Sequence, residues 1–63
     1  MHKLKQIRET AGMSQRELAN ASGVSIRMIQ HYEQGVKDIN KAAAITVKRL
    51  AESLNAKMED IIE

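Results

Sequence analysis

The fold is decided by residues 14–35, which read SQRELANASGVSIRMIQHYEQG. Ser14 and Glu17 have the spacing of a capping box, in which the serine oxygen accepts from the glutamate amide and the glutamate side chain returns the bond. A helix should therefore begin at Ser14. Gly23 should end it after about two turns, because glycine adopts the left-handed conformation of a helix end without strain. Ser25 can cap a second helix, which Gly35 ends.

These two short helices, joined by a turn that contains a glycine, form a helix-turn-helix pattern. Ala19 lies close to the expected crossing, where a larger side chain would push the helices apart. Met28, Ile29 and Tyr32 follow the helical period and should form the buried stripe of the second helix. The opposite face is mostly polar and carries Ile26, Arg27, Gln30, His31 and Gln34.

Three more helices are expected outside this motif. The first spans residues 2–11, and the fourth begins after Asn40 and can end at Asn55. A last short helix covers about residues 57–62, with Lys57 as a poor capping residue. The apolar stripe of the fourth helix comprises Ala43, Ala44, Val47, Leu50, Ala51 and Leu54. We therefore expect an all-α fold, a compact five-helix single domain over residues 1–63 with the helix-turn-helix at about 14–34.

The composition excludes several classes of protein. A chain of 63 residues is near the lower limit for a domain that folds alone. It has no cysteine, so it can form neither a disulfide framework nor a thiolate metal site. It has no apolar run that could span a membrane and no signal-peptide core, which predicts a soluble, cytoplasmic protein. No catalytic set of residues can be assembled, so we expect no enzyme, no cofactor, no metal and no small-molecule substrate.

The formal net charge is only +2, but the charges are unevenly placed along the chain. Residues 36–49 carry four cationic side chains and one carboxylate, whereas residues 50–63 carry one cation and four carboxylates. A basic body with an acidic end could face a polyanion with one side only. From charge alone, an ordinary mixed surface is an equally good interpretation.

With these features the sequence resembles the Cro and phage-repressor type of helix-turn-helix DNA-binding domain, found in XRE-like transcriptional regulators with a lambda-repressor-like fold. The resemblance covers nearly the whole chain, and its specific part runs from Ser14 to Gly35. It rests on Leu4, Ile7, Arg8, Gly12, Met13, Ser14, Gln15, Leu18, Ala19, Gly23, Val24, Ser25, Ile29, Tyr32, Glu33, Gly35, Leu50, Ala51 and Leu54.

The resemblance implies that the helix over residues 25–34 lies in the major groove of double-stranded DNA. The base-reading positions then fall on Ile26, Arg27, Gln30 and His31. The resemblance also implies a phosphate contact at Gln15. We expect further phosphate contacts at Ser25, Lys37 and Lys41, although the two lysines are most simply interpreted as solvated surface charges. The pair of Arg8 and Glu33 matches a largely buried salt bridge between the first and third helices, which would explain the charge of Arg8 on an apolar helix face.

These side chains also have simpler interpretations. Arg27 could be a solvated charge, although its guanidinium matches the O6 and N7 acceptors of guanine. Ile26 stands where a polar base reader is common, and it either belongs to the core or packs on a thymine methyl group. Residues 36–46 are about a turn longer than the commonest spacing of the family. Lys57 stands where serine or threonine is the usual cap.

The function that these observations predict is sequence-specific transcriptional regulation, as a repressor that binds a paired operator site. We expect a weak homodimer formed through the C-terminal part, with Ile45, Met58, Ile61 and Ile62 as the apolar contact residues. The same apolar residues allow an alternative. In that alternative the chain is an antitoxin or antirepressor-type module, and its main partner is a protein.

Overall fold

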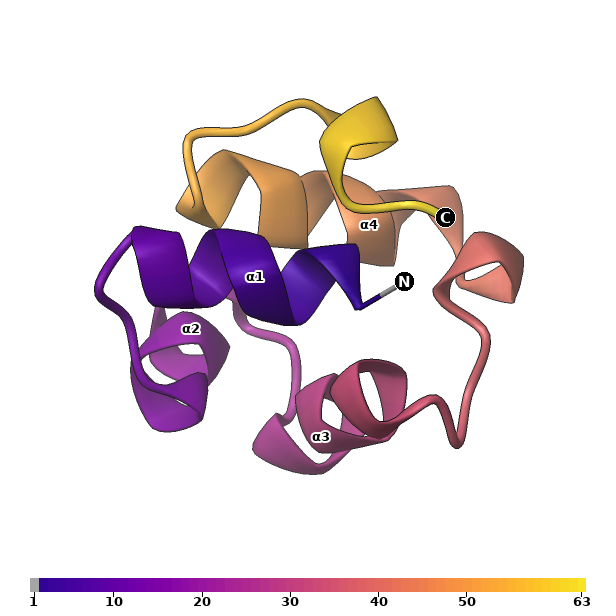
Figure 1. The fold of residues 1–63 in the computed structure, drawn as a ribbon, viewed down its shortest axis with the longest axis horizontal. Helices are drawn as coiled ribbons and strands as arrows, with labels where there is room; N and C mark the ends of the chain where they lie inside the picture. The colour runs from indigo at the N-terminus through magenta and orange to yellow at the C-terminus, as the bar shows by residue number, and fades with distance from the viewer. Residues whose placement is uncertain (1) are drawn as a thin grey trace.

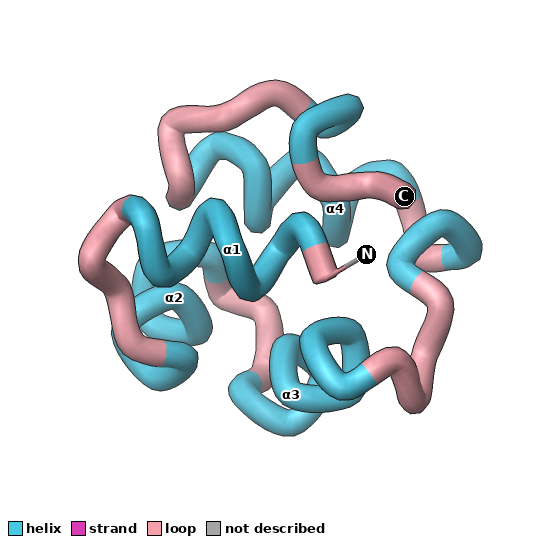
Figure 2. The backbone as a smooth tube through the Cα atoms, viewed as in Figure 1, coloured by secondary structure: helices cyan, strands magenta, loops and turns pink. Residues whose placement is uncertain are grey.

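The computed structural model describes residues 2–63, and these residues form four α-helices and two short 3-10 turns without a β-strand (Figures 1 and 2). In chain order they are α1 (Lys3–Thr10), α2 (Gln15–Ser22), α3 (Ile26–Gln34), η1 (Ile39–Lys41), α4 (Ala44–Ser53) and η2 (Met58–Asp60). The all-α prediction is confirmed. The prediction of five helices is wrong, because the fifth segment is a single 3-10 turn.

The helix-turn-helix is built as its local sequence predicts. The Ser14 hydroxyl accepts from the Glu17 amide at 3.0 Å, and the Ser14 amide donates to the Glu17 carboxylate at 2.8 Å, so both bonds of the capping box are present. Gly23 follows α2 with φ 75°, in the left-handed region. The hydroxyl of Ser25 then accepts from the amide of Met28 at 3.2 Å and starts α3. This local chemistry fixes where each helix begins and ends.

One apolar core holds the elements together. α2 packs against both α3 and α4, while α1 packs against α3. The buried apolar residues are Leu4, Leu18, Ile29, Ile39, Val47, Leu50, Ala51, Leu54 and Ile61. The stripe expected for α3 is only partly correct: Ile29 is fully buried and Tyr32 packs against the core, but Met28 is half-buried at the surface.

The start of α4 differs from the prediction. Residues 39–41 form a separate 3-10 turn, which Asp38 caps by accepting from the amide of Asn40 at 2.9 Å. Asn40 does not cap α4, because its side chain exchanges hydrogen bonds with the backbone of Glu63. α4 begins only at Ala44, so Ala44 and the preceding Ala43 are exposed rather than part of the buried stripe. The turn places Ile39 in the core.

The end of α4 is as predicted, but the segment after it is not. Asn55 adopts φ 54°, and the amide of Ala56 bonds the carbonyl of Ala51 at 2.8 Å, as in a Schellman motif. The following turn closes by bonds from residue i to residue i+3, and it brings Ile61 into the core with none of its surface exposed. Ile61 therefore cannot belong to an exposed dimer patch, which corrects that part of the prediction.

The fold separates α3 from the acidic end of the chain. In Figure 1, α3 lies along the lower edge of the molecule, whereas η2 lies at the upper edge, beyond α1 and α4. The carboxylates Glu59 and Asp60 belong to η2. In Figure 2, loops flank α3 at both of its ends, and no other helix of residues 2–63 lies beyond it at the lower edge of the view.

Candidate nucleic-acid interface

The outward face of α3 follows from what the helix buries. Ile29 and Glu33 point into the protein, with 0% and 5% of their surfaces exposed. Arg27 lies on the other side of the helix and is exposed, as is Gln34. The other three predicted base-reading residues are each partly exposed: Ile26, Gln30 and His31. The base-reading positions implied by the resemblance therefore reach solvent, and Arg27 is the most exposed of the four.

The phosphate-contacting positions lie around the two ends of this face. Gln15 is the first residue of α2, and its predecessor Ser14 caps that helix. Ser25 stands at the N-terminus of α3, where its oxygen already accepts from the amide of Met28. Lys37 and Lys41 are exposed in the segment that follows α3. Ser25 thus lies at the N-terminal end of α3, and Lys37 and Lys41 lie in the segment beyond its C-terminal end.

Lys37 and Lys41 border a surface hollow of about 560 Å³ between α3 and the start of α4. Its lining residues are Met28, Tyr32, Lys37, Asp38, Lys41, Ala42, Ala43 and Thr46. Ala43 precedes α4 and offers no side-chain cap, so the first amides of that helix have no side-chain acceptor. The two lysines and the uncapped helix N-terminus favour an anion at this hollow, whereas the Asp38 carboxylate, which also lines it, opposes one.

A buried salt bridge fixes the angle between α1 and α3. The Arg8 guanidinium donates from Nε to Glu33 Oε2 at 2.6 Å and from Nη2 to Glu33 Oε1 at 3.0 Å. Arg8 and Glu33 expose only 8% and 5% of their surfaces. The hydrogen bonds to Glu33 raise the pKa of the Arg8 guanidinium above its ordinary value. The pair expected from the resemblance is therefore in contact, and the charge of Arg8 is fully accounted for.

Arg8 also holds the loop between α1 and α2. Its Nη1 donates to the carbonyl of Met13 at 2.7 Å. Met13 directly precedes the capping residue Ser14, so one guanidinium connects α1, α3 and the start of α2. This arrangement positions α2 relative to α3 through hydrogen bonds as well as through apolar packing.

Two hydrogen bonds of the Gln15 side chain were not predicted from the sequence. Gln15 Nε2 donates to Glu33 Oε1 at 3.0 Å, and Gln30 Nε2 donates to Gln15 Oε1 at 3.4 Å. The amide of Gln15 thus lies between the buried salt bridge and the outer face of α3. No signal in the sequence reveals this link, because it depends on how α2 and α3 cross.

His31 has two different sides. Its backbone carbonyl accepts from the amides of Val36 and Lys37 at 2.9 and 3.2 Å, which ties the loop after α3 to the helix. Its Nδ1 atom is buried and has no hydrogen-bond partner among the described residues. Only the Nε2 side of the imidazole is then open for a contact with a base or a phosphate.

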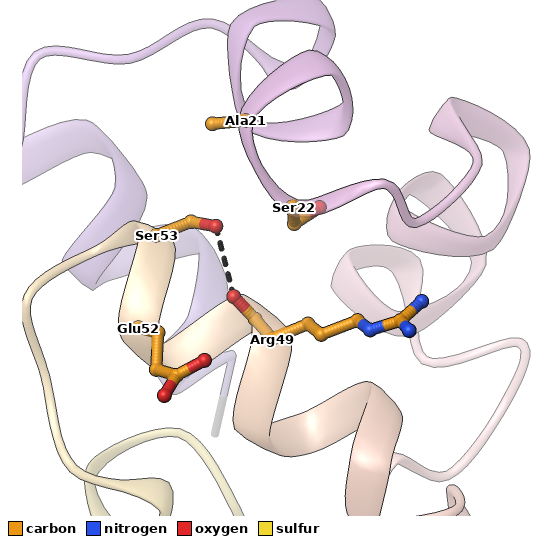
Figure 3. A pocket seen from close by; sticks show the side chains of 5 residues that line it. All are labelled: Ala21, Ser22, Arg49, Glu52 and Ser53. Carbon is orange, nitrogen blue, oxygen red and sulfur yellow. Dashed lines mark hydrogen bonds between the residues drawn. The ribbon is translucent and has the colours of Figure 1, made fainter.

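A second hollow lies elsewhere on the molecule. It measures about 300 Å³ and lies between the C-terminal ends of α2 and α4, where Figure 3 shows its five lining side chains. They are Ala21, Ser22, Arg49, Glu52 and Ser53, and the Ser53 hydroxyl donates to the carbonyl of Arg49 at 2.8 Å. None of them belongs to α3, so this hollow takes no part in the candidate interface.

Over residues 2–63, no three or more His, Cys, Asp or Glu side chains are grouped so that they could hold a metal ion. None of the helices in this part of the chain has the length and apolar character needed to cross a membrane.

Comparison with known proteins identifies one family. A family model described as helix-turn-helix matches residues 4–61, which is nearly the whole chain. No curated protein and no solved structure matches the sequence. The matched range begins at the second residue of α1 and extends past η2, so the family match covers the helix-turn-helix and the helices that support it.

Proposed function

Because the chain belongs to the helix-turn-helix family of Cro and XRE-type DNA-binding transcription regulators, we propose that it is a sequence-specific repressor that reads the major groove with α3. The observation that carries the proposal is the division of α3 into two faces. The inner face is buried in the protein through Ile29 and Glu33. The outer face exposes the positively charged Arg27 to solvent.

Base recognition is assigned to four side chains of α3. Arg27 contacts guanine through its paired donors, which match the O6 and N7 acceptors of that base. Gln30 and His31 contribute polar contacts from the next turn of the helix. Ile26, at the start of α3, packs on a thymine methyl group.

Phosphate contacts fix the register of the protein on DNA and carry no sequence information of their own. Gln15 and Ser25 supply them at the N-termini of α2 and α3. Lys37 and Lys41 supply them beside the uncapped start of α4. The acidic turn η2 lies on the far side of the molecule, where it does not repel the duplex (Figure 1).

A paired operator requires two copies of the chain. The exposed apolar residues that could join them are Ile45, Met58 and Ile62, which belong to α4 and to the C-terminal turn that packs against it. Because Ile61 is buried in the core, only these three side chains are left to form the contact, so the apolar area that could join two copies is small. We therefore propose a weak homodimer that forms on DNA, with two half-sites about one helical turn, roughly 34 Å, apart.

The experiment that tests the proposed function is selection of bound sequences from a random pool of double-stranded DNA. A recurring, two-fold symmetric motif is expected, together with an affinity that falls as salt rises. Recovery of unselected sequences at every salt concentration would contradict sequence-specific binding. Genomic neighbours provide a second check, because an adjacent toxin gene would favour the antitoxin alternative.

A further inference from the structure

Four polar side chains form a continuous hydrogen-bonded chain from the interior to the surface of α3. It begins at Arg8, passes through the carboxylate of Glu33 and the amide of Gln15, and ends at Gln30. The first members are buried, whereas Gln15 and Gln30 are partly exposed. The chain therefore connects a fixed charge pair to a side chain at the candidate interface.

The direction of every bond in this chain is determined by chemistry. A guanidinium can only donate, and a carboxylate can only accept. Gln15 must therefore turn its Nε2 toward Glu33, which leaves its Oε1 on the side of Gln30. Gln30 in turn must offer Nε2 to that oxygen. No described residue donates to Gln30 Oε1.

We propose that Gln15 is a positioning residue that sets the amide orientation of Gln30, so that α3 presents the Gln30 oxygen as an acceptor to the major groove. Adenine and cytosine offer an amino donor in that groove, whereas guanine and thymine offer only acceptors there. The second N–H of Gln30 Nε2 stays available as a donor, so the oxygen and this N–H together match the N6 and N7 atoms of adenine, and Gln30 favours adenine at the base it faces. This inference rests on the proposed function, in which α3 lies in the groove, and it adds a role for Gln15 besides its phosphate contact.

The link from Gln30 to Gln15 is 3.4 Å long, the longest bond in the chain. A bond of this length restricts the amide less firmly than the 3.0 Å bond from Gln15 to Glu33. We therefore expect the affinity for a site with the favoured base to exceed that for a site with another base by roughly 2- to 12-fold, the contribution of one neutral hydrogen bond.

The test compares Gln15→Met with the unaltered protein by selection from a random DNA pool. Methionine keeps the length of glutamine but has no amide, so the orientation of Gln30 is released. We expect the preference at the base facing Gln30 to fall below about twofold, while the guanine preference due to Arg27 remains. Overall affinity also falls, because the phosphate contact is lost.

The matched control is Gln30→Met, alone and combined with Gln15→Met. Gln30→Met should abolish the same preference, and adding Gln15→Met should change that position no further. A uniform loss of affinity in Gln15→Met, with the motif unchanged at every position, would overturn the positioning role. The positioning role would also be overturned if Gln15→Met altered the motif by the same amount in the unaltered protein and in the Gln30→Met variant.

A measurement without DNA separates this inference from the proposed function. The side-chain amide resonances of Gln30 in a ¹⁵N spectrum of the free protein should move in Gln15→Met and stay in place in Glu59→Ala. If Gln30 does not respond, the link is absent and the inference fails, whatever the DNA result. If Gln30 responds but the unaltered protein selects no motif, the proposed function fails, and the groove-reading role of Gln30 fails with it.

Discussion

The contact between Arg8 and Glu33 is the single-residue feature on which the stability of the domain depends most. Both side chains are charged, both are buried, and each compensates the charge of the other. Removing one partner leaves an uncompensated charge inside a protein of 63 residues. Domains of this size have a free energy of unfolding of only about 3–9 kcal/mol, so such a loss is large.

We predict that Glu33→Ala lowers the free energy of unfolding by about 3–5 kcal/mol, because Arg8 is left buried without its carboxylate. Chemical denaturation in a stabilising osmolyte would measure it. Exposed carboxylates provide the comparison, and Glu52→Ala should cost far less. If Arg8→Ala and Glu33→Ala prove additive in a double-mutant cycle, the two residues are not coupled and this interpretation is wrong.

Glu17 makes stability depend on pH. The hydrogen bond from the backbone amide of Ser14 lowers the pKa of Glu17 below its usual 4.5, and the Ser14 hydroxyl contributes in the same direction. The folded state therefore favours the carboxylate, so this contribution is fully present above about pH 4.5 and is lost as pH falls through the lowered pKa.

A comparison of Glu17→Gln with the unaltered protein would show this dependence. The variant should unfold at lower denaturant near pH 7, and the two midpoints should converge as the solution is made strongly acidic. A constant difference between the two proteins at every pH would mean that the charge of Glu17 does not contribute.

How well a side-chain contact could be predicted depends on how far apart its two residues lie in the sequence. Ser14 and Glu17 belong to one turn, so their pairing follows from spacing alone. The pairing of Arg8 with Glu33 required the resemblance to a family. The bond from Gln30 to Gln15 could not be predicted by either route, because it is set by the crossing of two helices.

Helix ends that are marked by a local glycine or serine could be predicted from the sequence. Helix ends that depend on contacts with distant residues could not. Gly23 and Ser25 place the turn between α2 and α3 by local conformation. The start of α4 was misplaced because Asn40 bonds Glu63, more than twenty positions away, instead of capping the helix. The last segment was predicted to be a helix, but a single 3-10 turn is enough to bury Ile61 in the core.

We predict that Gly23→Ala lowers stability by roughly 1–2 kcal/mol, the usual cost of placing a side chain in the left-handed conformation. A Cβ atom at this position would meet nothing within 4 Å, so strain in the backbone is the whole effect. Thermal and chemical denaturation both measure it. Gly23→Asn should cost less, because asparagine tolerates this conformation. Equal stability of all three proteins would refute the argument.

For the molecule as a whole, the arrangement of charge supports one-sided binding. The sequence alone left an ordinary mixed surface equally possible. The fold adds that α3, which carries Arg27, and the acidic turn η2 lie at opposite edges (Figure 1). A polyanion can therefore approach α3 without meeting that acidic turn.

The small apolar patch leads to a prediction about assembly. Ile45, Met58 and Ile62 expose 54%, 39% and 37% of their surfaces, and Ile61 exposes none. We expect a monomer or a weak dimer in solution that pairs on DNA, with Ile45→Lys weakening binding to a paired site but not to a single half-site. Analytical ultracentrifugation tests the first part. A tight dimer at nanomolar concentration would contradict it and would imply a larger interface.

The most direct test of base reading by α3 is the affinity of Arg27→Ala for the selected site and for each of its single-base variants, at one fixed salt concentration. We predict a loss of about 1–3 kcal/mol on the selected site and a relaxed preference at one G·C position, with the other positions unchanged. Glu59→Ala, on the opposite edge of the molecule, should bind every site as the unaltered protein does. If Arg27→Ala instead weakens all sequences by the same factor, Arg27 contacts only the DNA backbone, and α3 does not read bases as proposed.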